Sequence, residues 1–160
     1  MDSRTLSGAF PLKTPDSQDK CWTWLFVAWA LSLAAILGTL FFSEVMKLPP
    51  CSLCWYQRIA MYPLFPILTV GLIFRDPKVS RYAWPFAAAG GLLAIYHNLL
   101  YYDIIPKTIT PCTQGVSCTE RQLEWFGVIT IPLLSLVAFL LLATALFFFS
   151  KTSRELVHEN

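Results

Sequence analysis

Five cysteines carry the reactive chemistry of this 160-residue sequence. Two residues separate Cys51 from Cys54, five separate Cys112 from Cys118, and Cys21 stands apart from both pairs. A pair of thiols can form a disulfide, exchange it with a third thiol through a mixed disulfide, or bind a metal ion. Because five is an odd number, at least one thiol has no partner whatever the pairing.

The pair Cys51 and Cys54 follows Pro49 and Pro50, and this run is typical of a helix start, because proline is tolerated in the first helical turn. Residues three apart share one face of a helix, and the positive end of the helix dipole lowers the pKa of a thiol there. The pattern therefore favours a pair that exchanges electrons. The alternatives are a static disulfide, which would stabilise little across so short a loop, and half of a metal site.

The pair Cys112 and Cys118 lies in a polar segment with Pro111 before it and Gly115 inside it. This composition predicts an exposed loop with a tight reversal. Two exposed pairs in one compartment can exchange disulfides with each other and with a partner thiol. Four thiolates could instead bind zinc. Structural zinc sites, however, usually combine two cysteine pairs with few residues between the two cysteines of each pair, and Cys112 and Cys118 are more widely spaced. The spacing favours redox chemistry.

Arg58 lies four residues after Cys54 and seven after Cys51, so the three residues share one helical stripe. A charged side chain inside an apolar membrane segment is energetically costly, so its presence calls for a structural or functional explanation. One interpretation is that Arg58 extends its guanidinium to the membrane surface. The other is that it supplies positive charge to an electron-rich or anionic ligand beside the cysteines.

His97, followed by Asn98, lies in another apolar segment at a depth similar to that of Arg58. Either side chain could simply be a hydrogen-bonding group of the core. Together with Arg58, however, His97 could form one wall of a pocket for a lipid-soluble carrier with polar oxygens, such as a quinone. Oxidation of a dithiol releases two electrons and two protons, and the sequence has no haem-ligation run or Gly-x-Gly-x-x-Gly motif that would indicate another acceptor.

Four apolar segments must position these residues, and they cover 22–43, 55–74, 83–102 and 126–149. Hydrophobic residues make up 56% of the chain and charged residues only 14%, against about 25% charged in ordinary soluble domains. About 20 helical residues cross a hydrocarbon core. The sequence therefore predicts an all-α fold, a single integral membrane domain built as a four-helix bundle. A net charge of +2 without basic clusters argues against a nucleic-acid partner.

Basic residues are unevenly distributed between the segments outside these four helices. Eight lie in the tails 1–21 and 150–160 and in the loop 75–82, whereas three lie in the loops 44–54 and 103–125. Because short cytoplasmic loops are enriched in Lys and Arg, both termini are expected in the cytoplasm. The two cysteine pairs then face the outside, where disulfides persist, and the lone cysteine faces the reducing side. The eight are Arg4, Lys13, Lys20, Arg75, Lys78, Arg81, Lys151 and Arg154, and the three are Lys47, Lys107 and Arg121.

The run from Pro50 to Arg58, PCSLCWYQR, followed by Met61-Tyr62-Pro63, resembles the DsbB/BdbC family of bacterial disulfide-bond formation proteins, and most closely its BdbC-like branch. The likeness covers nearly the whole chain. Four apolar segments, Cys-x-x-Cys before the second, a histidine in the third and a cysteine pair before the fourth follow the order of that family. The resemblance implies a multi-pass protein of the bacterial inner membrane with its redox cysteines on the extracytoplasmic side.

The same resemblance implies a membrane thiol oxidase, a protein-dithiol:quinone oxidoreductase without a bound metal. Cys112 and Cys118 would exchange disulfides with a thioredoxin-fold, DsbA-like partner. Cys51 and Cys54 would then pass the electrons to ubiquinone or menaquinone of the membrane pool. The short spacing of Cys112 and Cys118 departs from the better-known members, which have a long segment between these cysteines, and this leaves the docking of the partner open.

Arg58 and His97 match the quinone-proximal positions of the family. Two other interpretations remain open. The vitamin K epoxide reductase family also combines a four-helix bundle, a Cys-x-x-Cys pair and a quinone, but it has that pair late in the chain and the loop pair early, the reverse of the order here. A membrane metal-handling protein would instead use the cysteines as ligands, and measured metal content would distinguish it from an oxidase.

Overall fold

A computed structural model describes residues 15–102, 104 and 130–158. All regular secondary structure in these ranges is helical, with no strand, which confirms the predicted all-α class for this part of the chain. Cys112, Cys118 and the predicted loop 103–125 around them lie outside the described residues, apart from Ile104.

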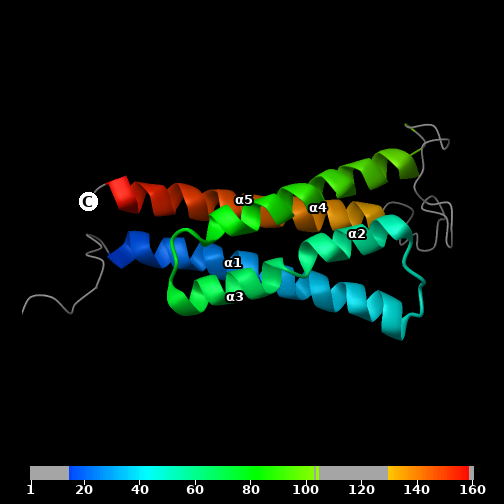
Figure 1. Ribbon diagram of the computed structural model, residues 1–160, viewed down its shortest axis with the longest axis horizontal. Helices are drawn as coiled ribbons and strands as arrows, with labels where there is room; N and C mark the ends of the chain where they lie inside the picture. Colours follow the sequence, from blue (N-terminus) through cyan, green and yellow to red (C-terminus); the bar gives the residue numbers. More distant parts are fainter. Residues whose placement is uncertain (1–14, 103, 105–129, 159–160) are drawn as a thin grey trace, which may run out of the picture.

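The helices run beside one another along the long axis of the molecule (Figure 1). The first, α1, continues at its end into a short π-helical turn, η1. The elements are α1 (Pro15–Leu40), η1 (Phe41–Val45), α2 (Ser52–Met61), α3 (Leu64–Phe74), α4 (Val79–Tyr101) and α5 (Ile131–His158).

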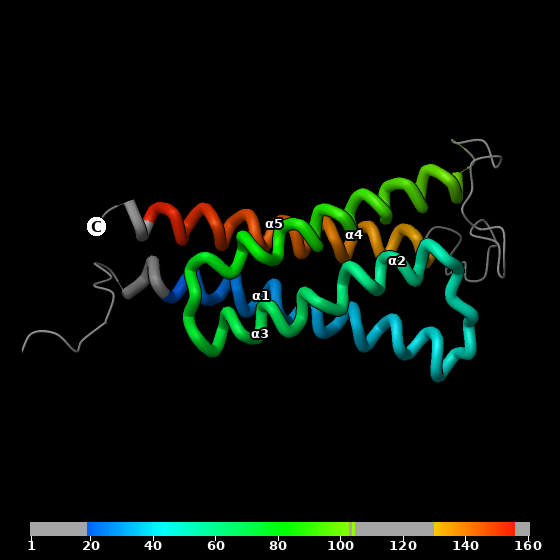
Figure 2. The backbone as a smooth tube through the Cα atoms, viewed as in Figure 1, coloured from blue at the N-terminus to red at the C-terminus, as the bar shows by residue number. Residues whose placement is uncertain are grey.

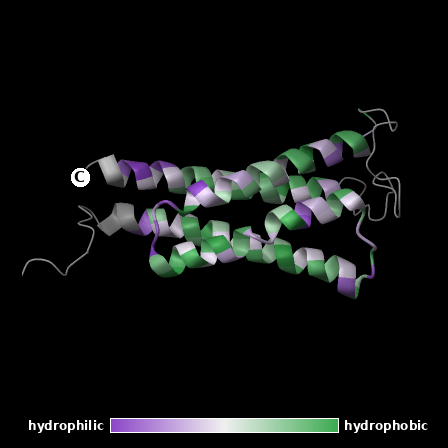
Figure 3. Ribbon diagram, in the orientation of Figure 1, coloured by the Kyte–Doolittle hydropathy of each residue, from purple (hydrophilic) through white to green (hydrophobic). Residues whose placement is uncertain are grey.

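Three helical stretches are long and apolar enough to cross a membrane among the residues that the structure describes: Asp19–Val45, Ser52–Phe74 and Ile131–Glu155. Only 17%, 39% and 28% of their most apolar windows are buried inside the protein, so most residues of these windows are half-buried or exposed. Hydrophobic residues cover the middle of the helices, whereas hydrophilic ones lie mainly toward the ends (Figure 3). An apolar exterior of this kind suits lipid as the surrounding solvent.

The expected third span, 83–102, forms most of α4 but is not one of those three stretches. The helix contains an internal proline, two glycines, three tyrosines, His97 and Asn98, and these residues lower its mean hydropathy. Helix α4 is therefore present where the sequence predicts a helix, and its crossing of the membrane remains a prediction.

The expected second span, 55–74, consists of two helices rather than one. Helix α2 begins earlier, at Ser52, and ends at Met61, and α3 begins after Pro63. Proline has no amide hydrogen and clashes with the preceding turn, which explains a break at Tyr62 and Pro63. The other helices also differ from the expected limits, because α1 and α4 begin earlier, at Pro15 and Val79, and α5 begins at Ile131 and continues to His158.

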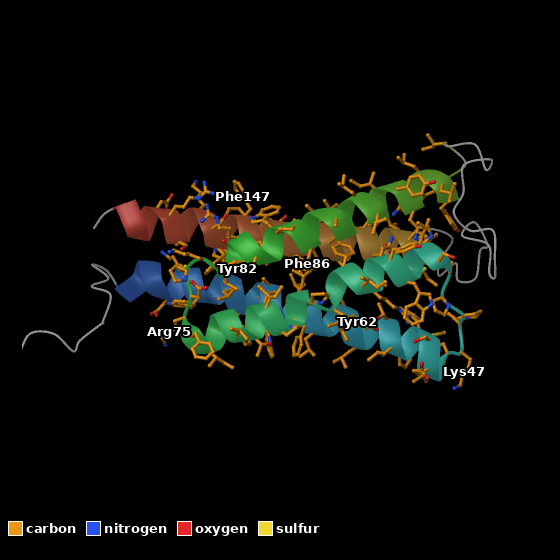
Figure 4. The ribbon with its side chains drawn as sticks, in the orientation of Figure 1. Lys47, Tyr62, Arg75, Tyr82, Phe86 and Phe147 are labelled. Atoms are coloured by element: carbon orange, nitrogen blue, oxygen red, sulfur yellow. The ribbon has the colours of Figure 1, made fainter. Side chains whose placement is uncertain are left out.

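The connection between α3 and α4 lies at the same end of the molecule as the start of α1 and the end of α5, and α2 begins at the opposite end (Figures 1 and 2). Lys47 and Arg75 mark these two ends (Figure 4). The described start of α1 and the described end of α5 lie at the same end of the molecule, as expected if both termini are on one side of a membrane. Which side of a membrane this end faces remains a prediction.

The core lies where α5 packs against α1 and α4, with α2 and α3 completing the packing against α4 and α1. Helix α4 presents small residues at intervals of three or four along its buried face, which lets the helices approach closely. At Gly90 the ring of Phe139 on α5 occupies the space that a Cβ atom would need. Those small residues are Ala83, Ala87, Gly90 and Ala94.

The substitutions Gly90→Ala and Gly91→Ala should have different effects on the free energy of unfolding. Both replace a glycine inside α4, and the helical preference of alanine adds about 0.5–1 kcal/mol in each case. Only the methyl group at position 90 meets Phe139, whereas position 91 has nothing within 4 Å. We expect Gly90→Ala to lower the free energy of unfolding by about 1–3 kcal/mol, as overpacking usually does, and Gly91→Ala to preserve or raise it. Thermal unfolding of the purified variants in detergent measures both, and equal effects would contradict the close α4–α5 contact.

Candidate redox site

The Cys51 side chain caps the N-terminus of α2. Its backbone is extended, with φ −71° and ψ 168°, and its Sγ accepts a hydrogen bond from the backbone N–H of Cys54 at 3.4 Å. Pro49 and Pro50 precede the cap, and the helix continues from Ser52. The predicted helix start at the Cys-x-x-Cys motif is therefore confirmed.

The two cysteines of this motif are free thiols whose Sγ atoms lie 2.9 Å apart. Cys51 is buried and Cys54 is half-buried. Their spacing places both sulfurs on the same side of the helix start, so a disulfide between them requires only a short approach of the two atoms. The arrangement suits a pair that alternates between dithiol and disulfide.

The Cys51 thiol lies one residue before the stretch Ser52–Phe74 and is strongly acidified. The hydrogen bond from the Cys54 thiol is the largest cause and, with His97 contributing, it lowers the pKa of Cys51 to about 4, although burial acts in the opposite direction. A lowered pKa increases the share of thiolate at neutral pH. The thiolate is the nucleophilic form in disulfide exchange.

His97, on α4, lies between Cys51 and Gln57. Its Nε2 is 3.9 Å from the Cys51 Sγ, and its Nδ1 is 3.4 Å from the Gln57 Nε2. When the amide of Gln57 donates to Nδ1, the imidazole proton lies on Nε2 and faces the Cys51 sulfur. His97 is only 2% exposed, so this arrangement is shielded from water.

Gln57 was not predicted from the sequence as part of the site. Gln57 is buried and lies three residues after Cys54, on the same helical face. That spacing could have indicated Gln57 from the sequence alone. Its contact with His97 could not be predicted, because this contact depends on the packing of α2 against α4.

The Arg58 guanidinium points into the protein. The residue is only 9% exposed, and its Nη2 donates a hydrogen bond of 2.8 Å to the carbonyl oxygen of Thr39 near the end of α1. Its central carbon lies 5.5 Å from the centre of the Trp55 ring, a distance suited to a cation–π contact. Of the two sequence interpretations, this geometry favours an inward-facing charge over one extended to the membrane surface.

A cavity of about 240 Å³ brings these side chains together. Helices α1, α2, α4 and α5 contribute to its walls, which are mostly apolar. The polar side chains in the lining are Thr39, Cys51, Cys54, Gln57, Arg58, His97 and Ser135, and the apolar ones include Ala34, Phe42, Met61, Leu134, Ala138 and Phe139. The two sequence-predicted residues Arg58 and His97 therefore line one cavity together with the Cys51–Cys54 pair.

Asn98 does not line this cavity. Its side-chain amide donates hydrogen bonds of 2.8 Å to the carbonyl oxygens of Ala94 and Pro132, and its Oδ1 has no partner within the described part of the chain. The bond to Ala94 lies within α4, and the bond to Pro132 joins α4 to the first turn of α5. Asn98 is therefore a hydrogen-bonding group of the core, which is one of the two roles considered from the sequence, and it fixes α4 next to the site.

Cys21 lies on α1, buried in a packed core cluster. The other free thiols of the described residues, Cys51 and Cys54, are at the opposite end of the molecule. Cys112 and Cys118, which the resemblance assigns to partner exchange, are not described. The structure thus supports one cysteine pair at the cavity and leaves the second pair as a prediction.

Cys51, Cys54 and His97 also offer three potential metal ligands, all within 4.8 Å of one another. Two sulfurs around one tetrahedral zinc ion, each about 2.3 Å from the metal, lie roughly 3.8 Å apart. The observed separation of 2.9 Å is shorter. The separation of the two sulfurs therefore suits formation of a disulfide between them better than it suits a zinc site.

Comparison with known proteins gives consistent results. Residues 20–149 match the family described as "Disulfide bond formation protein DsbB". "Probable disulfide formation protein C 2" of Bacillus cereus is 50% identical over 117 residues, which are 72% of this chain and 83% of that protein. "Disulfide bond formation protein C" of Bacillus subtilis is 45% identical over 118 residues, 74% of this chain and 86% of that protein. No solved structure matches this chain.

Titration of the reduced protein should detect the acidified thiol. Thiolate absorbance near 240 nm, taken as the difference between the unchanged protein and Cys51→Ser, should already be present at neutral pH and disappear only as the pH falls toward about 4. Cys54→Ala removes the largest cause of the low pKa and should move the midpoint upward. Cys21→Ala is the control and should leave the midpoint unchanged. A midpoint in the unchanged protein near the ordinary thiol value of about 8.5 would contradict this geometry.

Proposed function

Because the chain belongs to the DsbB family of disulfide bond formation proteins, we propose that it is a membrane thiol oxidase that reoxidises a thioredoxin-fold, DsbA-like oxidase and passes the electrons to a membrane quinone. The observation that carries the proposal is the pair Cys51 and Cys54. Its two sulfurs lie 2.9 Å apart and line an apolar cavity that also holds Arg58 and His97.

The electrons enter at the second cysteine pair. A reduced partner gives up two electrons and two protons when its two thiols become a disulfide, and the disulfide of Cys112 and Cys118 becomes two thiols. Exchange with the disulfide of Cys51 and Cys54 then restores the Cys112–Cys118 disulfide and leaves Cys51 and Cys54 as thiols. Each step forms one disulfide and breaks another, so no electron is lost to solvent.

The cavity fits a quinone by the chemistry of its lining. Apolar residues from four helices suit a lipid-soluble ring, and the donors of Arg58 and Gln57 suit ring oxygens, with His97 in the same lining beside Cys51. A bound quinone would supply the acceptor for two electrons and two protons. Ubiquinone and menaquinone are both compatible with such a lining.

Three side chains prepare the Cys51 sulfur for this reaction. The Cys54 Sγ lies 2.9 Å from it and the His97 Nε2 lies 3.9 Å from it, and hydrogen bonds with both side chains favour negative charge on the Cys51 sulfur. The Arg58 guanidinium provides a fixed positive charge in the same cavity. A fixed charge in an apolar surrounding stabilises developing negative charge better than a mobile ion in water.

We further propose that the protein lies in the bacterial inner membrane with both termini in the cytoplasm. The distribution of basic residues supports this orientation. The start of α2 lies at the end opposite to the described ends of α1 and α5, which supports placing the Cys51–Cys54 pair and the termini on opposite sides. The cysteines that exchange electrons then face the oxidising compartment.

A metal-handling function is the second candidate, since Cys51, Cys54 and His97 could act as ligands. Elemental analysis of protein purified without chelators distinguishes the two. An oxidase should contain far less than one equivalent of zinc or copper, and stoichiometric metal would favour the alternative.

Reoxidation of a reduced thioredoxin-fold oxidase by the purified protein tests the proposal. With ubiquinone or menaquinone added in turn, the partner should lose two thiols for every quinol formed. Cys54→Ser should abolish quinol formation, whereas Cys21→Ser should preserve it. In Cys118→Ser, a mixed disulfide between Cys112 and the partner should accumulate, because the resolving thiol is missing.

Partner oxidation without quinol formation would contradict the proposed electron acceptor. A partner trapped on Cys51 in place of Cys112 would reverse the proposed order of the two pairs. Loss of activity in Cys21→Ser at equal protein level would show that the assignment of the cysteines is wrong.

A further inference from the structure

A second groove lies at the end of the molecule opposite to Cys51, between the start of α4 and the last turns of α5. It encloses about 590 Å³. The α3–α4 connection borders it, and Ser153 on α5 donates a hydrogen bond of 3.1 Å to the carbonyl oxygen of Pro77 in that connection. This bond fixes the two walls of the groove relative to each other.

Three cations line this groove: Lys78 and Arg81 at the start of α4 and Arg154 on α5. All three are exposed, and no aspartate or glutamate is part of the lining. Among the side chains that the structure describes, none of the three forms an ion pair with a carboxylate. The nearby Asp76 side chain instead accepts a hydrogen bond from the backbone N–H of Lys78 at 2.9 Å. The groove therefore has a local excess of positive charge.

The lining changes from polar to apolar along α4. Lys78 is the N-cap residue, Ser80 and Arg81 lie in the first turn, Trp84 and Pro85 follow, and Ala88 lies further along the helix. At a rise of about 1.5 Å per residue, this change occurs over roughly 15 Å. Tryptophan is typical of the boundary between headgroups and hydrocarbon. A soluble anion would contact only the basic end of the groove. A phospholipid has a charged headgroup followed by an acyl chain, and this order matches the polar and then apolar lining of the groove.

We propose that this groove binds an anionic phospholipid. The phosphate would interact with Arg81 and Arg154, which approach it from two helices, and the upper acyl chain would lie along Trp84 and Ala88. Arginine suits this role because its planar fork of donors matches phosphate oxygens. Basic grooves between membrane helices are a recognised means of binding acidic lipid headgroups. This site is separate from the cavity at Cys51 and does not depend on the proposed oxidase activity.

Native mass spectrometry of the full-length protein in neutral detergent tests the site, with equal amounts of dioleoyl phosphatidylglycerol and dioleoyl phosphatidylcholine added. The unchanged protein should retain more phosphatidylglycerol than phosphatidylcholine. Arg154→Gln and Arg81→Gln should each reduce phosphatidylglycerol binding about fivefold, because a cation near the surface contributes about that factor. Phosphatidylcholine binding should stay unchanged, which also shows that the variants remain folded.

Lys151→Gln is the matched control. It removes the same charge from the same helix one turn away from Arg154, and Lys151 does not line the groove. Phosphatidylglycerol binding in this variant should remain close to that of the unchanged protein. Equal losses in Lys151→Gln and Arg154→Gln would overturn the proposal, because they would indicate a general effect of surface charge.

Glycerol phosphate and inorganic phosphate form the remaining arms of the experiment. Neither should displace phosphatidylglycerol at millimolar concentration, because neither contacts the apolar part of the groove. Displacement by either would show a site for a soluble anion and would contradict a lipid occupant. An unchanged protein that retains the two lipids equally would likewise overturn the proposal.

Discussion

The buried positive charge of Arg58 is the constraint on which the site depends. A charged group shielded from water is costly unless it is paired or hydrogen-bonded. The structure meets this requirement with the carbonyl oxygen of Thr39 at 2.8 Å and the ring of Trp55. The bond to Thr39 joins α2 to α1 at the point where α1 becomes the π-helical turn η1. One polar contact therefore both solvates the charge and positions the helix that carries the cysteines.

The other helices are fixed around the site by similar polar contacts within an apolar interior. Gln57 joins α2 to His97 on α4, and Asn98 joins α4 to the carbonyl oxygen of Pro132 on α5. Because each contact has few alternatives in apolar surroundings, each specifies one relative placement of two helices. Cys51 is held by its position as the cap of α2 and lies within reach of His97. The thiol pair is thus positioned by helix ends and buried bonds.

The sequence predicted an all-α fold and several residues that the structure places around one cavity. Long apolar segments indicated α1, α4 and α5, the prolines before Cys51 indicated the start of α2, and the unusual placement of Arg58 and His97 indicated a shared cavity. The break at Pro63 was not predicted, because proline in an apolar helix can either kink it or end it. Contacts with backbone carbonyls could not be predicted, since the carbonyl of Thr39 carries no sequence signal. Gln57 was missed because its role exists only once α2 packs against α4.

Single-turnover kinetics of Arg58→Met show whether the buried charge of Arg58 serves the proposed electron transfer from the cysteines to a quinone. This substitution keeps most of the side-chain volume and removes the charge. Partner exchange should stay normal while quinone reduction slows by about 10²–10³, the usual effect of removing a preorganised electrostatic group. Arg58→Lys should be intermediate, because it keeps the charge without the planar fork. Normal quinone kinetics in Arg58→Met across a range of quinone concentrations would contradict the account.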